Sequence, residues 1–463
     1  MKKRMRSSLL ALALMVSLTA CGQAPASDTA SAQPSASASA SASASASASD
    51  TATPAQNTEP VVLKMIEHSN QGTNEAVKNL NADFMQKNPN ITVESTIAGT
   101  EQYPQLMQTR IAASDVDIFE LTCFNIVNPE WAKGLDANAA AQYIDNGDVM
   151  DLTEQPFVKN WDPAANADAN TYKGKIYSLN IGKVAFNGIF YSKKIFKEQG
   201  IEVPQTWDEF TAACRKLQDA GIAPMTSGGK DVWPIAMMWS GFVNAFEADP
   251  ADFNRKLWTG ERKYTDEQTL KMFDRMAEFA TFYEQGVTAV DYASVIGRFV
   301  AGKAAMMPDG TWQGAQITAA DPNFEFGYFC IPGETKSDKP AQLAGKYDLG
   351  YAGYSKTKNP EAVLQWLGFL SEKENYTKFV NTNGFIPTMQ GVEMNNAFIN
   401  SLAPLNENFR LGYELVGRSP KGMGKYGGFA ITELKVLGGE IATTKELADL
   451  AQKDWDAAIA AIQ

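Results

Sequence analysis

The feature that most constrains the fold is an alternation of strand and helix patterns between residues 61 and 121. Three short segments have the apolar or alternating pattern of strands: 61–67, 91–97 and 116–121. A helical pattern lies between the first two segments, and Pro104 stands where a second helix is expected to start. This order of elements predicts a parallel sheet with right-handed crossovers, so the predicted fold class is α/β.

Local signals mark where the predicted helices start and stop. Thr73 is the expected cap of the first helix, which Asn88 and Pro89 should end. Thr206 and Glu209 form an S/T-x-x-E capping box at the start of a later helix. In each helix, apolar residues recur three and four positions apart, which predicts one buried face.

The first 58 residues differ in composition from the rest of the chain. Basic residues precede an apolar run over 9–20, which is the pattern of a secretory signal. The run is shorter than the roughly twenty residues that a membrane-spanning helix needs. Residues 21–58 are rich in Ala and Ser and contain no Leu, Ile, Val or aromatic residue, so we expect a disordered tether there.

The end of the apolar run resembles the lipobox of bacterial lipoproteins. Leu18, Thr19, Ala20 and Cys21 match it, and the resemblance implies a signal peptide over 1–20 and lipidation of Cys21. Two acyl chains suffice to anchor a protein stably to a membrane. The alternative is an ordinary signal peptide in which the cysteine has no role. The resemblance implies an extracytoplasmic protein anchored to the outer face of the cell membrane, and a Gram-positive cell surface is expected.

Charge and rare residues exclude several classes of function. Without the four basic residues of the leader, the chain has 37 basic and 53 acidic residues, so its surface repels nucleic acid. His68 is the single histidine, which excludes a His-rich zinc site and confines any Ser-His-Asp triad to this one residue. Neither a nucleophile elbow nor a Walker loop occurs. We therefore expect no catalytic residue, no metal and no cofactor.

Two further motifs have plain structural interpretations. Cys123, Cys214 and Cys330 are an odd and widely spaced set, which predicts buried free thiols, with one disulfide as the alternative. Residues 422–427 match the pattern G-x-G-x-x-G. No strand pattern precedes that segment, and too little chain follows it for a dinucleotide-binding unit, so a loop is predicted.

Several sequence blocks occur in an order that resembles a known family. They are "FMQKNPNITVE", "NGDVMDLT", "YKGKIYSLN", "GIFYSKKIFKEQGIEVPQTWDEF", "FVAGKAAMMPDGTW", "FGYFCIPG" and "KTKNPEAVLQWLGFLSEKENYTKFVNTNGFIPT". Together they resemble the bacterial extracellular solute-binding proteins that feed ABC importers, in the carbohydrate-binding branch that includes maltose-binding protein. Ser178 and Ser192 depart from the family pattern at scaffold positions.

The resemblance implies two α/β lobes joined by hinge strands, with a ligand cleft between them that closes on the ligand. The expected lobes are 59–182 with 326–372, and 183–325 with 373–463. The expected crossings between them lie near 181–185, 324–328 and 371–375.

By resemblance, the protein captures a carbohydrate, expected to be an oligosaccharide, and delivers it to permease subunits as a monomer without doing chemistry. Two alternatives stay open. One is a binding protein for a peptide, amino acid or polyamine. The other is a surface glycoside hydrolase, which needs a pair of carboxylates across its cleft.

A sugar site needs aromatic faces for stacking and carboxylates or amides for hydrogen bonds. Trp312 matches the family's stacking position, and Asp309 is the expected hydroxyl acceptor beside it, with a solvated turn as the alternative. Trp233 is chosen for the cleft and Trp239 for the core. Trp207 and Trp366 are also predicted to be core residues.

Other candidates follow predicted strands, because ligands of such folds bind at the carboxyl ends of parallel strands. These candidates are His68, Asn70, Glu120, Phe124, Asn125, Tyr347 and Asp348.

Overall fold

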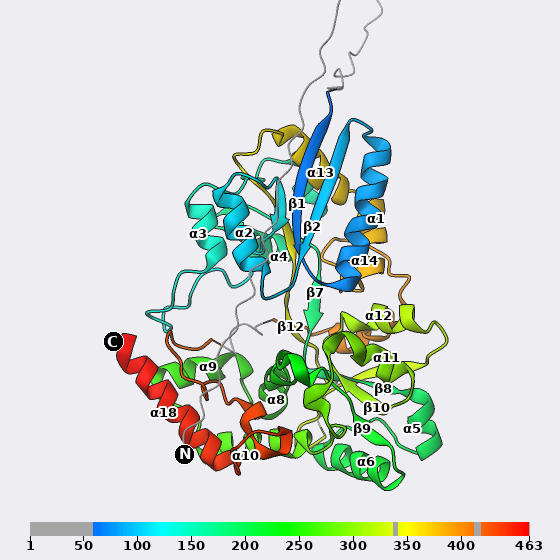
Figure 1. Cartoon of the computed structure of the whole chain (residues 1–463), viewed down its shortest axis with the longest axis vertical. Helices are drawn as coiled ribbons and strands as arrows, with labels where there is room; N and C mark the ends of the chain where they lie inside the picture. Colours follow the sequence, from blue (N-terminus) through cyan, green and yellow to red (C-terminus); the bar gives the residue numbers. More distant parts are fainter. Residues whose placement is uncertain (1–58, 337–340, 412–417, 463) are drawn as a thin grey trace, which may run out of the picture. The chain divides into compact units, whose positions relative to one another are not determined.

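A five-stranded sheet forms from the alternating segments at the start of the folded part of the chain (Figure 1). Its strand order is β2-β1-β3-β13-β6, where the strands are β1 Val61–His68, β2 Ile91–Ala98, β3 Ile118–Glu120, β6 Leu179–Asn180 and β13 Gly350–Gly353. β1 runs parallel to both β2 and β3, which confirms the predicted parallel core of the sheet. β13 pairs antiparallel with β3 and with β6.

The computed structural model describes residues 59–336, 341–411 and 418–462. The predicted signal peptide, Cys21 and the tether lie outside the described residues. Within the described part of the chain, no helix is long and apolar enough to cross a membrane.

The first helix starts two residues earlier than its expected cap. In α1 (Gln71–Lys87), the Oδ1 atom of Asn70 accepts a hydrogen bond from the backbone N–H of Thr73 at 3.2 Å. Thr73 is therefore a buried residue of the first turn and not the cap, so that prediction is wrong. Asn88 ends the helix as predicted, and Pro104 lies in the first turn of α2 (Tyr103–Ala112), one residue after its start.

A second sheet has the order β11-β8-β10-β9. Its strands are β8 Gly188–Ser192, β9 Ala223–Met225, β10 Ala304–Pro308 and β11 Phe326–Cys330. α6 (Trp207–Asp219) begins with the predicted capping interaction, in which Thr206 Oγ1 accepts from the backbone N–H of Glu209 at 3.2 Å. The carboxylate of Glu209 accepts from the backbone N–H of Gln205 at 2.7 Å, one residue before the position that a standard capping box uses.

A small sheet of order β14-β12-β7 connects the two larger ones; its strands are β7 Lys183–Ala185, β12 Ala344–Tyr347 and β14 Arg410–Leu411. Figure 1 shows β7 and β12 between the sheet that contains β1 and the sheet that contains β8. The chain leaves the first sheet after β6 and enters the second at β8 by way of β7.

Two of the expected crossings are wrong. β11 pairs with β8 along its whole length, from Phe326 opposite Ser192 to Cys330 opposite Gly188, so residues 326–330 belong to the second sheet. The chain returns to the first sheet later, through β12 and β13. α14 (Lys373–Asn383) packs beside α1 on the first lobe, so no crossing occurs at 371–375 (Figure 1). The expected lobe boundaries at 325/326 and 372/373 are corrected accordingly.

The remaining elements complete the layers around these sheets. They are α3 Ala139–Asp145, α4 Pro163–Ala165, β4 Thr171–Tyr172, β5 Lys175–Ile176, α5 Lys193–Gln199, α7 Trp233–Ala236, α8 Met238–Phe246, α9 Pro250–Thr259, α10 Glu267–Ala280, α11 Val295–Val300, α12 Gln313–Ala320, α13 Pro360–Leu370, α15 Ala397–Ser401, α16 Ala403–Asn406 and α18 Thr444–Ile462.

Large aromatic side chains fill the core on both sides of the connecting strands. Trp207 and Trp366 are fully buried, as predicted. The Nε1 atom of Trp366 donates to Asn81 Oδ1 at 2.7 Å, and the Trp366 ring meets that of Tyr351 edge-on at 5.4 Å. Cys123, Cys214 and Cys330 are free and buried, which confirms that prediction. Residues 422–427 form turns, as expected.

The substitution Trp366→Phe should lower the free energy of unfolding by about 1–3 kcal/mol, because it leaves the buried Oδ1 of Asn81 without its donor. Trp131→Phe is the matched control; Trp131 is only half-buried, and we expect a loss below about 1 kcal/mol. Urea unfolding measures both. Equal losses in the two variants would show that the Trp366–Asn81 hydrogen bond contributes nothing.

Candidate functional site

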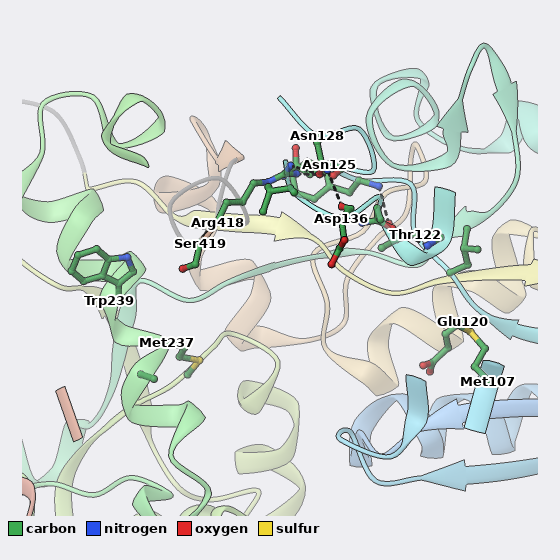
Figure 2. A pocket seen from close by; sticks show the side chains of 16 residues that line it. Met107, Glu120, Thr122, Asn125, Asn128, Asp136, Met237, Trp239, Arg418 and Ser419 are labelled. Carbon is green, nitrogen blue, oxygen red and sulfur yellow. Dashed lines mark hydrogen bonds between the residues drawn. The ribbon is translucent and has the colours of Figure 1, made fainter. Parts of the chain in front are cut away.

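A pocket of about 670 Å³ opens between the end of β3 and the segment that joins α7 to α8 (Figure 2). One wall consists of Met107 on α2 and of residues that follow β3. The opposite wall consists of Ala236, Met237 and Trp239, together with Arg418 and Ser419. The residues from the end of β3 to the start of α3 that line it are Glu120, Leu121, Thr122, Phe124, Asn125, Asn128, Leu135, Asp136 and Asn138. Its size is within the range typical of small-molecule sites.

Glu120 is the most buried charged side chain of this pocket, with 7% of its surface exposed. Its Oε2 atom lies 2.7 Å from His68 Nδ1 and accepts a hydrogen bond from the backbone N–H of His68 at 3.1 Å. Its Oε1 atom is buried and has no hydrogen-bond partner among the residues that the structure describes. A buried acceptor of this kind costs free energy until a donor reaches it, so Glu120 can receive a hydrogen bond from a ligand.

A second buried carboxyl group, that of Glu67, is linked to the His68–Glu120 pair through the side chain of Asn74. Burial alone would lower the pKa of His68, but the hydrogen bond that its ring donates to Glu120 and the negative charge of Glu120 together outweigh burial and raise that pKa. Burial raises the pKa of Glu67 to about 7, even though Asn74 donates a hydrogen bond to that carboxyl group at 3.1 Å. The same Asn74 amide donates to the backbone carbonyl of His68 at 3.0 Å, which links the two residues.

Arg418 fixes the loop on the opposite side of the pocket. Its Nη1 atom donates to Asn128 Oδ1 at 3.0 Å, and its Nη2 atom donates to the backbone carbonyl of Asn125 at 2.8 Å. The carbonyl of Arg418 itself accepts from Trp258 Nε1 at 3.0 Å. The guanidinium is therefore engaged by the protein, and it orders the segment that presents the amides of Asn125 and Asn128.

A group of aromatic side chains, here named the aromatic shelf, adjoins the wall formed by α7. It comprises Phe186, Trp233, Tyr292 and Trp312. Trp233 lies 4.5 Å from Tyr292 and 6.4 Å from Trp312 between ring centroids, and Phe186 lies 5.2 Å from Trp312. Trp233 is the first residue of α7, which leads directly to Ala236 and Met237 in the pocket wall.

The structure brings some of the predicted site residues together in the pocket. Glu120, Phe124 and Asn125 line it, and His68 contacts Glu120. Tyr347 is buried and meets Phe124 edge-on at 5.4 Å. These residues converge because β1 and β3 are adjacent parallel strands whose carboxyl ends lie at the same edge.

Other predicted residues lie elsewhere. Asn70 caps α1 with its side chain, and Asp348 lies 3.5 Å from Lys346 in an ion pair. Trp233 and Trp312 belong to the aromatic shelf. Asp309 is 1% exposed, so the solvated turn is wrong. Its two carboxylate oxygens accept hydrogen bonds from Gly310, Tyr292 and Gln313.

The interpretation of Trp239 as a core residue is incomplete. Its ring packs against Phe253 and Phe273, yet it is only partly buried and lines the pocket. Helical spacing could not separate these two roles, because one face of α8 meets both the core and the pocket. Asn128, Met237 and Arg418 were not predicted at all; no sequence pattern marks them, since they reach the pocket only through the packing of distant segments.

Metal binding finds no support in the described residues, where no group of three or more His, Cys, Asp or Glu side chains could hold an ion.

Comparison with known proteins identifies the family to which this chain belongs. The model of the family described as bacterial extracellular solute-binding protein matches residues 69–377. The Multiple sugar-binding protein of Streptococcus mutans is 25% identical over 345 residues, which cover 71% of this chain and 76% of that protein. The Melibiose/raffinose/stachyose-binding protein MelE of Bacillus subtilis is 22% identical over 333 residues, which cover 70% of this chain and 72% of that protein.

Two solved structures share the fold. RafE in complex with raffinose superposes with a TM-score of 0.66 at 19% identity, covering 87% of this chain and 99% of RafE. A chitin oligosaccharide binding protein superposes with a TM-score of 0.68 at 21% identity, with the same coverage. The molecule therefore has the two-lobed fold of the solute-binding proteins. More particularly, the chain belongs to the bacterial extracellular solute-binding protein family, which places it outside the cytoplasm.

The stability of the protein should fall as the pH rises from about 4.5 to 7. Burial raises the pKa of Glu67 from 4.5 to about 7 and that of Asp309 from 3.8 to about 7, so the folded state binds more protons than the unfolded chain in this range. Each group contributes a slope of up to about 1.4 kcal/mol per pH unit. His68 acts in the same direction, because its raised pKa gives stability that is present below its ordinary pKa of 6.5 and is lost as the pH rises through the folded value.

Urea unfolding at intervals between pH 4.5 and 8 measures this slope. Glu67→Gln and Asp309→Asn should each make it shallower, whereas Glu94→Gln, at an exposed position on β2, should leave it unchanged. A flat profile in the unmodified protein would contradict the prediction.

Proposed function

We propose that this protein captures a neutral oligosaccharide outside the cytoplasm and delivers it to the permease of an ABC importer. The observation that carries the proposal is the buried Oε1 atom of Glu120, which lacks a donor among the described residues at the edge of a pocket of about 670 Å³. Figure 2 shows the Glu120 carboxylate directed into that pocket. A sugar hydroxyl is a donor of the required kind.

The rest of the pocket supports a sugar in preference to a purely apolar ligand. Trp239 and Phe124 supply aromatic rings to the pocket for the C–H groups of a pyranose, and the Nδ2 atom of Asn125 is a buried donor without a partner among the described residues. The relatives named for multiple sugars and for melibiose, raffinose and stachyose support the same class of ligand.

A charged solute is the second candidate, and two of the three charged groups that line the pocket, Arg418 and Asp136, argue against it. The guanidinium of Arg418 already donates to Asn125 and Asn128. The carboxylate of Asp136 pairs with Lys421 Nζ at 2.9 Å. Neither group is poised to neutralise the carboxylate of an amino acid or the ammonium groups of a polyamine.

Glycoside hydrolysis is not supported by the same carboxylates. The reaction needs two carboxyl groups that face one bond, one of them held protonated by its surroundings. Asp136 is 71% exposed and bound to Lys421, and Glu120 is bound to His68. We therefore propose a protein that binds its ligand and leaves it unchanged.

The leader and the tether complete the proposal. Cys21 would carry the lipid anchor, and residues 21–58 would hold a monomeric folded body away from the outer face of the membrane of a Gram-positive cell. The chain after the leader has a net charge of −16, so an acidic membrane surface would repel it, and electrostatic attraction could not replace the lipid anchor.

Thermal unfolding across a panel of ligands tests the proposed function. Raffinose, stachyose, melibiose, chitin oligosaccharides, amino acids, short peptides and polyamines are added in turn to the purified protein. A ligand present at a hundred times its dissociation constant should add about 2.7 kcal/mol of stability, which raises the midpoint by several degrees. A shift with amino acids, peptides or polyamines and none with any sugar would contradict the proposal.

Glu120→Gln should weaken the binding of the sugar that gives the largest shift by about 10- to 100-fold. The cause is the loss of a charge-assisted hydrogen bond, which contributes about 1.5–3 kcal/mol. Isothermal titration measures the affinity, and Glu94→Gln on the same sheet is the control that should bind like the unmodified protein. An unchanged affinity in Glu120→Gln would remove Glu120 from the site.

Cys21→Ser should release the protein from the cell. Without the thiol no acyl chain can be attached, and the protein should move from the membrane fraction to the medium. Metabolic labelling with a palmitate analogue and cell fractionation measure this change. Label that persists in the serine variant would show that Cys21 is not the lipidated residue.

A further inference from the structure

Tyr292 occupies the centre of the aromatic shelf. Its hydroxyl accepts hydrogen bonds from Trp312 Nε1 at 2.8 Å and from Gln313 Nε2 at 2.6 Å, and it donates to Asp309 Oδ1 at 3.2 Å. One donor and two acceptor positions are all that a phenolic hydroxyl has, so its hydrogen-bonding capacity is fully used by the protein.

The backbone and the ring of Tyr292 also have close contacts with neighbouring residues. The backbone N–H of Tyr292 donates a hydrogen bond to Asp231 Oδ2 at 2.7 Å, which ties Tyr292 to the loop before α7. A Cβ atom at Gly228 would lie 2.6 Å from the Cα and 2.8 Å from the Cβ of Tyr292, so only glycine permits this close approach. Trp233 then meets the ring edge-on at 4.5 Å.

Trp233 and Trp312 are the two tryptophans of the shelf that contact Tyr292. Trp233 is 38% exposed and Trp312 is partly buried, and their rings are tilted by 39° to one another. An exposed indole without a fixed partner samples several rotamers, and a ligand that stacks on it must then offset the entropy of ordering it. A fixed pair of rings avoids that cost.

We propose that Tyr292 is a positioning residue that sets the orientations of Trp233 and Trp312 and thereby strengthens the binding of a sugar on the aromatic shelf. The inference rests on the proposed function for its ligand, but the positioning itself is a property of the ligand-free protein. Tyr292 acts through the two indoles and not by its own contact with sugar, since its hydroxyl has no capacity left.

Asp309 anchors this arrangement from the buried side. Its carboxyl group accepts from Tyr292, from Gln313 and from the backbone N–H of Gly310 at 2.7 Å, and burial raises its pKa to about 7. The group that faces Tyr292 is thus ionised only in part at neutral pH, and its ionised form is the better acceptor for the tyrosine hydroxyl. The other ionisable groups near it are Tyr283 and Tyr328, whose pKa values burial raises.

The test uses the variant Tyr292→Phe in the full chain, first without ligand. The substitution keeps the ring and removes the acceptor for Trp312 Nε1. We expect the near-ultraviolet circular dichroism of the indoles to weaken and acrylamide quenching of tryptophan fluorescence to increase, while the far-ultraviolet spectrum is unchanged. Tyr354→Phe is the matched control: it removes a buried hydroxyl that lies 2.9 Å from Ser114 Oγ in the other lobe, and both indole signals should stay as in the unmodified protein.

The second measurement is the affinity for raffinose, stachyose, melibiose and chitin oligosaccharides. Tyr292→Phe should weaken binding about tenfold, the effect of one hydrogen bond of about 1.4 kcal/mol. Tyr354→Phe should bind normally even if it is less stable. In the background of Trp312→Phe, adding Tyr292→Phe should cost much less than it does alone, because its effect passes through Trp312.

The outcomes separate the two proposals. If no sugar binds the unmodified protein, the proposed function fails, and the indole signals still decide whether Tyr292 positions the tryptophans. If sugars bind but Tyr292→Phe has the affinity and the indole signals of the unmodified protein, the positioning role is overturned. Additive losses in the double variant would likewise overturn a role that acts through Trp312.

Discussion

The parallel pairing of β1 with β3, with Ile66 opposite Phe119, is the constraint on which the candidate site depends. Two adjacent parallel strands end at the same edge, so His68, the last residue of β1, and Glu120, the last residue of β3, meet there at 2.7 Å. That contact holds one oxygen of Glu120 and leaves the other without a partner among the described residues, in the wall of the pocket. A shift of β3 by one residue relative to β1 would turn the side chain of Glu120 to the opposite face of the sheet.

Buried carboxyl groups recur in this protein close to the surfaces that we assign to ligand. Glu67 lies behind the His68–Glu120 pair, and Asp309 lies behind Tyr292. Burial raises the pKa of both groups to about 7, which means that folding places them where their charge is unfavourable. Such positions lower stability near neutral pH.

The second lobe supplies the indole of Trp239 to the pocket, whereas the first lobe supplies the carboxylate of Glu120 and the amide of Asn125. Trp239 in the pocket and Trp233 at the start of α7 are only six residues apart, so one short segment presents an indole to the pocket and another to the aromatic shelf. Tyr292 and Trp312 come from elements that follow much later in the chain, and a hydrogen bond of 2.8 Å joins them. The site is thus assembled from at least four segments, each held by its own packing.

Features that depend on local sequence patterns were predictable. They are the alternation of strands and helices at the start of the folded part, which gave the α/β class, the helix start at Thr206, and the burial of Trp207 and Trp366. Glu120, Phe124 and Asn125 were also predictable as pocket residues, because the carboxyl end of a parallel strand is a local feature. The sequence could not show that β11 pairs with β8, since its apolar run fits either sheet, nor that Arg418 reaches Asn125 across nearly three hundred residues. Those contacts depend on which surfaces pack together in the complete tertiary structure. For the same reason, only the tertiary structure decided which residues form the second wall of the pocket and that Tyr292 lies at the centre of the aromatic shelf.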